Sequence, residues 1–230
     1  MPIGMGLAGG RLGYGLAQSA GAAAVPAAWW YVAGKTAIGA YLFKGAASLT
    51  VARVNLVTPG TYDLTDGVAP TFATATGATF NGLTQYLKTG IVPGSGWSAV
   101  IRFSDRLLGG DAFSIYKSGN QRFAIEPYTG ANQLRYQNGS FLSVTPLATS
   151  GVLAIAGQQG YRNGVADGGA IGGWGAALAA GDDIYLGARH RADISGVDAY
   201  CPITVQAFAV YSDTLDAAQN AALYTAIMAL

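Results

Sequence analysis

Three Asn-Gly pairs, at 81–82, 138–139 and 163–164, stand beside short stretches in which apolar and polar residues alternate. Asn-Gly readily supplies the positive φ angles that a two-residue hairpin turn requires. The clearest alternating stretch is 97–104 (WSAVIRFS), whose period of two is typical of a half-buried strand. Similar stretches follow at short intervals. The sequence therefore predicts an all-β, antiparallel protein in which two sheets bury their inner faces against each other.

The last segment, 215–230, changes from the strand period to the helical one. Asp216 and Gln219, three positions apart, have the spacing of a capping box. Leu223 and Ile227 lie on one apolar stripe of helical spacing. Alanine dominates the segment and proline is absent from it, so helix propensity agrees with the pattern. We expect a short C-terminal helix that closes the sandwich.

The charge balance limits the partners of the chain. Its 230 residues include 13 basic and 12 acidic side chains, and charged residues make up only 11% of the total. This balance gives no broad electrostatic field to attract nucleic acid or anionic lipid, so we expect no nucleic-acid partner. A surface with so few charges also suits a protein that is partly covered in an assembly.

The sequence divides into three parts. Residues 1–35 form a Gly/Ala-rich arm whose glycines oppose a stable solitary helix. Glycines and Pro26 interrupt its uncharged run, so we expect no membrane insertion. Residues 36–70 hold short apolar runs between turn signals and are predicted to be a linking strand region, and 71–230 is the predicted sandwich.

The arm is predicted to be an assembly interface. Its large apolar side chains would form a costly patch if they were exposed, so we expect them to be buried against neighbouring subunits. The interface residues are Leu7, Leu12, Tyr14, Leu16, Trp29, Trp30 and Tyr31.

Five motifs follow one another in a recognisable order. They are FNGLTQYLKTG at 80–90, WSAVIRFS at 97–104, GYRNGV at 160–165, IYLGA at 184–188 and AFAVYSDTLDAAQNAALYTAI at 207–227. Together they resemble the concanavalin A-like, laminin G-type β-sandwich, or jelly roll, of bacteriophage virion and tail proteins. The resemblance covers about residues 71–230. It places Tyr161 and Arg162 on a strand, and Asn163 and Gly164 in the turn that follows it.

The resemblance implies a non-enzymatic structural protein of a bacteriophage particle, located in the virion as a decoration, collar or tail component. The N-terminal arm would then bind other virion proteins and sister subunits, with the sandwich displayed outward. A host-surface glycan-binding module is the alternative function, and a carbohydrate-active enzyme is a second alternative.

Catalytic residues are not evident in the sequence. Glycoside hydrolases of this fold need two carboxylates that flank the scissile bond. Glu126 is the only glutamate, and no carboxylate stands two or four residues from it. His190, between two arginines, is expected at the surface, and Cys201 is expected to be buried packing. We therefore predict no catalytic residue.

A sugar site needs an aromatic platform and planar polar groups around it. Trp174, in a Gly-rich segment, is the candidate platform. Its candidate polar neighbours are Tyr161, Arg162, Asn163, Arg189 and Arg191. The alternative interpretation is that Trp174 anchors a loop to the core.

Calcium is the one cofactor that the resemblance brings into consideration, because many laminin G-type and lectin relatives bind it through carboxylate and carbonyl oxygens. Asp182, Asp183, Asp193 and Asp198 are the candidate ligands. Loop aspartates also commonly form Asx turns, and that alternative stays open. No other cofactor is expected.

Overall fold

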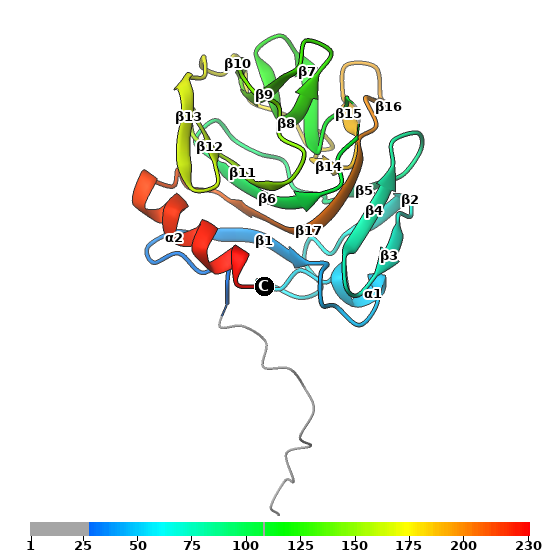
Figure 1. Cartoon of the computed structure of the whole chain (residues 1–230). Helices are drawn as coiled ribbons and strands as arrows, with labels where there is room; N and C mark the ends of the chain where they lie inside the picture. The colour runs from blue at the N-terminus through cyan, green and yellow to red at the C-terminus, as the bar shows by residue number, and fades with distance from the viewer. Residues whose placement is uncertain (1–27, 108) are drawn as a thin grey trace, which may run out of the picture.

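A computed structural model describes residues 28–107 and 109–230. It contains two antiparallel sheets that face each other, with a short helix at the C-terminus (Figure 1). The predicted all-β sandwich is confirmed. In the part of the chain that is described, no helix is long and apolar enough to cross a membrane.

The first sheet, sheet A, has its long strand β17 near the centre. In spatial order its strands are β13 (Val165–Ala170), β12 (Gln159–Arg162), β11 (Gly151–Ala156), β6 (Ser98–Ser104), β17 (Pro202–Tyr211), β4 (Gly77–Asn81) and β3 (Thr71–Ala73), and β1 (Ala37–Leu42) pairs with the second half of β17.

The second sheet, sheet B, has a small extension at one side. In spatial order its strands are β10 (Ser140–Val144), β9 (Gln133–Asn138), β8 (Gln121–Thr129), β7 (Phe113–Ser118), β14 (Tyr185–Leu186), β5 (Tyr86–Lys88) and β2 (Thr65–Val68). The extension is β15 (Arg189–Arg191), which runs parallel to β7 and pairs with β16 (Gly196–Asp198).

The predicted linking region, 36–70, contributes directly to both sheets. β1 pairs with β17 in sheet A and β2 pairs with β5 in sheet B. Between them lies the single-turn helix α1 (Leu49–Ala52). Tyr41 and Phe43 are fully buried in the core, so the body of the sandwich includes residues that precede 71.

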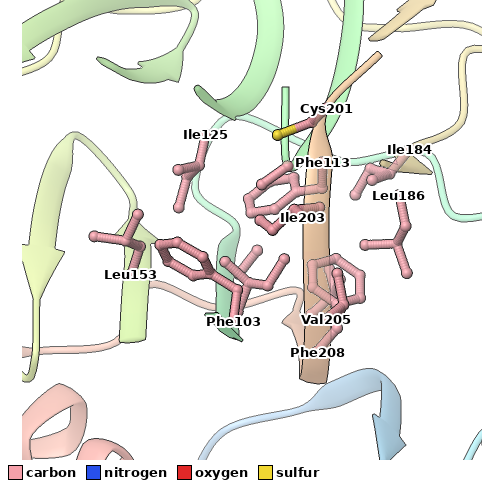
Figure 2. Close-up of a cluster of buried hydrophobic side chains, with 14 of the residues drawn as sticks. Phe103, Phe113, Ile125, Leu153, Ile184, Leu186, Cys201, Ile203, Val205 and Phe208 are labelled. Carbon is pink, nitrogen blue, oxygen red and sulfur yellow. The ribbon is translucent and has the colours of Figure 1, made fainter. Parts of the chain in front are cut away.

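The main core fills the space between the two sheets. Alternate side chains from facing strands meet there, including Phe103 of β6, Phe113 of β7 and Phe208 of β17 (Figure 2). Cys201 lies among them with no exposed surface, which confirms its predicted packing role. Burial raises the pKa of its thiol to about 12, so the thiol stays protonated at neutral pH.

A second core covers the outer face of sheet A. The helix α2 (Ala217–Met228) lies across that face and buries Leu223 and Ile227 against it. Val100 of β6 points into this second core, whereas its neighbour Ile101 points into the main core. Successive side chains of a strand point to opposite faces of the sheet. Alternate residues of the same strand therefore contribute to the main core and to the second core.

Trp29 belongs to this second core and is only 3% exposed. It packs edge-on against Trp30, whose carbonyl oxygen accepts a hydrogen bond from the Tyr211 hydroxyl at 2.7 Å. The prediction that Trp29 is buried against a partner subunit is therefore corrected. The tryptophan is buried within its own chain.

The capping box of α2 is confirmed. The Asp216 carboxylate accepts a hydrogen bond from the Gln219 backbone N–H at 2.8 Å, and the Gln219 side-chain oxygen accepts one from the Asp216 N–H at 2.9 Å. These two bonds satisfy N–H groups that the first turn of a helix leaves without partners.

The Asn-Gly pairs turn the chain as expected at two of the three places. Asn163 and Gly164 both have positive φ, 49° and 80°, and join β12 to β13. Gly139 joins β9 to β10 with a φ of 86°. Asn81 acts differently, because its side-chain oxygen accepts backbone N–H groups of the loop that follows β4.

Residues 28–36 and α2 lie on one side of the sandwich, over sheet A. The strands β7 to β10 of sheet B lie on the other side (Figure 1). The outer face of sheet B is therefore remote from the point at which the N-terminal segment meets the body.

Candidate functional site

A polar cavity of about 430 Å³ opens at one side of sheet B, where β5, β14 and β15 come together. We call it the edge pocket. Its principal lining side chains are Tyr86, Lys88, Asp182, Tyr185, His190 and Ser195.

Three rings form a stack along the edge pocket. The rings of Tyr86 and Tyr185 are 5.1 Å apart at 21°, and those of Tyr185 and His190 are 4.2 Å apart at 4°. The residues on either side of Tyr185, Ile184 and Leu186, are fully buried in the main core, so alternation places the Tyr185 ring on the opposite face of the sheet. There it is 8% exposed, because it is covered by Tyr86 and His190. The stack holds the three rings rigidly beside the cavity.

Gly67 on β2 makes room for the outer ring of this stack. A Cβ atom at residue 67 would overlap the ring of Tyr86, whose partner on β2 is the next residue, Val68. A glycine here therefore allows the tyrosine to lie flat over β2 and against Tyr185.

Polar atoms around the pocket are held by local hydrogen bonds. The His190 Nδ1–H donates to the Asp183 carbonyl oxygen at 2.8 Å, which leaves Nε2 as the ring nitrogen that can contact a ligand. Burial raises the pKa of the Tyr185 hydroxyl to about 12, with the nearby Asp183 carboxylate adding to the effect. The hydroxyl therefore remains a hydrogen-bond donor at neutral pH.

Asp182 is held by two donors at the rim of the pocket. It accepts hydrogen bonds from the Lys117 ammonium and the Ala179 N–H, both at 2.7 Å. Burial acts to raise the pKa of this carboxyl, but the two hydrogen bonds outweigh it and the pKa lies below its ordinary value. The pocket thus has a fixed carboxylate acceptor.

A second group of side chains lies on the outer face of sheet B, beside the edge pocket. We call it the arginine face. Its members are Tyr116 of β7, Arg122 of β8, Arg135 of β9, Phe141 of β10, and Arg189 and Arg191 of β15. Strand register brings them together, since Tyr116 pairs with Arg122 on one side and with Arg191 on the other.

Carboxylates neutralise three of the four arginines. Arg135 pairs with Glu126 at 3.1 Å. Arg189 pairs with Asp198 at 2.7 Å, and Arg191 contacts Asp198 at 3.1 Å and Asp193 at 2.6 Å. These interlocked pairs fix the guanidinium groups in place.

A buried carboxyl lies behind this face. Asp111 is 1% exposed, and burial raises its pKa to about 7, with the nearby Glu126 charge acting in the same direction. Burial also raises the pKa of Glu126, against the opposing charges of Arg135 and Arg189. The sequence does not indicate a role for Asp111, because this residue follows two glycines and belongs to no motif.

The predicted sugar-binding residues are not gathered into one site. Tyr161 is 6% exposed in the second core beneath α2, and Asn163 forms a turn. Arg162 pairs with Asp167 at 2.8 Å. Arg189 and Arg191, by contrast, lie on the outer face of sheet B, so the predicted set is divided between two sides of the sandwich.

Trp174 packs against the main core, and its ring N–H donates a hydrogen bond to the Asn138 side-chain oxygen. With Trp97 it lines an apolar cavity of about 310 Å³. The core-anchoring interpretation thus describes its position, although the residue also lines this cavity. The predicted grouping around Trp174 is corrected, because none of its five predicted polar neighbours lines the cavity: Tyr161, Arg162, Asn163, Arg189 and Arg191.

The four candidate calcium ligands are engaged in hydrogen bonds and ion pairs with other residues. Asp182 pairs with Lys117, Asp183 accepts the Gly90 N–H at 3.0 Å, and the other two aspartates, Asp193 and Asp198, bind arginines. Among the residues that the structure describes, no group of three or more His, Cys, Asp or Glu side chains is placed to hold a metal ion. The predicted set is corrected accordingly.

Residues of the predicted arm fall into two groups. Leu7, Leu12, Tyr14 and Leu16 lie outside the described residues. Of the others, Trp29 is buried, Trp30 is partly buried and Tyr31 is 72% exposed. His190, predicted at the surface, is only 8% exposed because it stacks on Tyr185, and this prediction is also corrected.

No protein-family model and no curated protein sequence matches the chain. Among solved structures, domain 4 of AbnA, a GH43 extracellular arabinanase from Geobacillus stearothermophilus, was determined in complex with arabinotriose. It matches with a TM-score of 0.57 at 18% identity, over 83% of this chain and 98% of that domain.

Trypanosoma rangeli sialidase gives matches of the same quality. Its complex with sialic acid has a TM-score of 0.57 at 15% identity, over 82% of this chain and 32% of the sialidase. A mutant with trans-sialidase activity has a TM-score of 0.54 at 15% identity, over 84% and 33%. This chain therefore spans about a third of the length of the sialidase chains.

The likeness shows the fold. The chain shares a β-sandwich with domains of carbohydrate-active enzymes. The predicted link to phage virion proteins is not supported by these matches and rests on the sequence motifs.

Proposed function

We propose that the protein is a glycan-binding module that holds a sugar in the edge pocket and breaks no bond. The observation that carries this proposal is the stack of Tyr86, Tyr185 and His190 beside a polar cavity of about 430 Å³. Sugars present hydroxyl groups and apolar C–H faces together, and rigid rings beside fixed polar groups suit both.

The donors and acceptors in the pocket match those of a sugar. The Lys88 ammonium lies 5.8 Å from the centre of the Tyr185 ring, and Asp182 supplies a carboxylate. A ligand with many hydroxyl groups can donate to Asp182 and accept from Lys88 at the same time. The volume lies at the lower end of the range for small-molecule sites, which suits one or two sugar units.

The comparison with the arabinanase domain supports the same proposal. That domain was solved in complex with arabinotriose, and this chain covers 98% of it. The proposal transfers only the class of ligand, because the identity is 18%.

We propose binding without catalysis because Asp182 is the one carboxylate among the described residues that line the edge pocket. It is held by the Lys117 ammonium and the Ala179 N–H. Glycoside hydrolysis needs one carboxyl on each side of the scissile bond, both in contact with the sugar. Glu126 and Asp111 do not line the pocket, and Asp111 is 1% exposed, so neither supplies the second carboxyl.

The bacteriophage setting is a second proposal, which the sequence motifs carry. The arrangement supports it, because residues 28–36 lie over sheet A, whereas the arginine face lies on sheet B. The strands β7 to β10 of sheet B are on the other side of the sandwich (Figure 1). An arm that binds virion proteins or sister subunits would leave that face outward. Immunogold labelling of intact particles tests this setting, and an unlabelled particle would contradict it.

Replacing Tyr86 by alanine tests the proposed site. The side chain is partly exposed, so the sandwich is expected to stay folded while the outer ring of the stack is lost. We expect the dissociation constant of a bound glycan to rise by about tenfold or more, the loss of roughly 1.5 kcal/mol of aromatic contact. Isothermal titration calorimetry of the ligand found in a glycan-array screen measures the change.

Tyr31→Ala is the matched control, because Tyr31 is an exposed aromatic residue on the sheet A side of the molecule. It should leave the dissociation constant unchanged. Equal affinities for wild type and Tyr86→Ala would place the sugar elsewhere, and a glycan array without any binding would remove the proposed function.

A further inference from the structure

Three guanidinium groups converge on a single tyrosine ring. Arg122, Arg191 and Arg189 lie 5.1, 5.2 and 5.7 Å from the centre of the Tyr116 ring. They come from β8 and β15, on either side of β7. The negative face of an aromatic ring attracts cations, but one neutral ring does not cancel three positive charges.

Carboxylates balance this group incompletely. Asp198 serves both Arg189 and Arg191, and Asp193 serves Arg191 again. Arg122 donates instead to the neutral Gln137 side-chain oxygen at 3.2 Å. Within residues 28–107 and 109–230, Arg122 forms no ion pair with a carboxylate. The ion pairs between described residues therefore leave Arg122 as the one guanidinium group of the arginine face that has no carboxylate partner.

Arg122 is held in place by rings in the absence of a counter-charge. Its guanidinium lies 5.1 Å from the Tyr116 ring and 5.6 Å from the Phe141 ring, which is 50% exposed. Burial lowers the pKa of Arg122, and the charges of Arg135 and Arg189 lower it further, whereas Tyr116 and Asp111 act in the opposite direction. The two neighbouring guanidinium charges favour an anion placed beside Arg122.

The arginine face and the edge pocket are next to each other. Ser114 of β7 pairs with Tyr185, which lines the pocket, and Tyr116 follows Ser114 by two residues on the same strand. Ala192, another lining residue, donates its N–H to the Tyr116 carbonyl oxygen at 2.9 Å. A chain of two or three sugar units can therefore reach from the edge pocket to the arginine face.

We propose that Arg122 binds a carboxylate or sulfate group of an acidic glycan, one sugar unit of which occupies the edge pocket. This inference rests on the proposed glycan-binding function and adds the class of glycan. A planar guanidinium suits both groups, because two of its N–H donors can meet two oxygens of one anion.

Matched pairs of oligosaccharides test the inference. The first pair is an oligogalacturonate and its methyl ester, and the second is a sulfated galactan oligosaccharide and its desulfated form, so one member of each pair is neutral. Calorimetry should show that wild type prefers the charged member of at least one pair by about tenfold or more, as expected for a hydrogen bond between charged groups. The pair that shows the preference distinguishes carboxylate from sulfate.

Arg122→Gln removes the charge and keeps a polar side chain. We expect this variant to lose about tenfold in affinity for the charged glycan and to bind the neutral one as wild type does. Arg122→Lys keeps the charge without the planar fork and should retain part of the preference. Lys44→Gln, after β1 on the sheet A side, changes net charge equally and should have no effect.

The outcomes distinguish a failure of the acidic-glycan inference from a failure of the proposed glycan-binding function. Equal binding of charged and neutral members by wild type, or an unchanged preference in Arg122→Gln, overturns the acidic-glycan inference and leaves glycan binding in place. Absence of binding to every member, charged or neutral, by folded wild type overturns both. Rising salt should weaken only the charged interaction, which checks the preference in wild type without any mutation.

Discussion

Trp29→Ala is expected to lower the free energy of unfolding by about 3–5 kcal/mol, the usual cost of replacing a buried tryptophan by alanine. The side chain is 3% exposed and fills the second core with Leu223 and Ile227 of α2. Removing the indole leaves a cavity between the helix and sheet A, and the backbone held by the Tyr211 hydroxyl limits its collapse. Urea unfolding followed by tryptophan fluorescence measures the loss.

Tyr31→Ala is the control for this prediction, since Tyr31 is only two residues away and 72% exposed. It should change the free energy of unfolding by less than about 0.5 kcal/mol. A similarly small effect of Trp29→Ala would show that the segment before β1 does not pack on α2. That result would support the prediction that Trp29 is buried against a partner subunit.

The buried Asp111 carboxyl is expected to make stability fall as pH rises. Burial raises its pKa from the ordinary 3.8 to about 7 in the folded state. Between these values the folded chain holds a proton that the unfolded chain has released, so folding is favoured more at low pH. The stabilising effect is full below about pH 4, declines as pH rises toward 7, and amounts to about 4 kcal/mol.

Asp111→Asn tests this effect because asparagine has a similar shape and does not ionise. The difference in free energy of unfolding between variant and wild type should grow in favour of the variant by about 4 kcal/mol between pH 4 and pH 8. Denaturant titrations at several pH values measure it. A difference that stays constant across this range would mean that Asp111 is ionised in the folded protein at all of these pH values.

The strand and helix pattern was predictable from local sequence. Alternation in 97–104 gives β6, and the Asp216–Gln219 spacing gives the start of α2. Each of these signals depends on neighbours within a few residues. The position of Trp29 was not predictable in this way, because burial against α2 joins residues about 190 positions apart.

The candidate site was predicted only in part. Arg189 and Arg191 do lie on an outer sheet face, but their neighbours Tyr116 and Arg122 come from β7 and β8. The register between β7 and β15, which no local motif specifies, brings them together. Tyr185 had a visible signal, since alternation with Ile184 and Leu186, which lie in the main core, places it on the opposite face of the sheet.

The most direct test of the account is an NMR titration of ¹⁵N-labelled wild-type protein with the glycan selected by array screening. Glycan binding in the edge pocket predicts chemical-shift changes centred on β5, β14 and β15, with those of Tyr86, Tyr185 and His190 among the largest. Changes centred on α2 or on the cavity between Trp97 and Trp174, with the edge pocket silent, would contradict it.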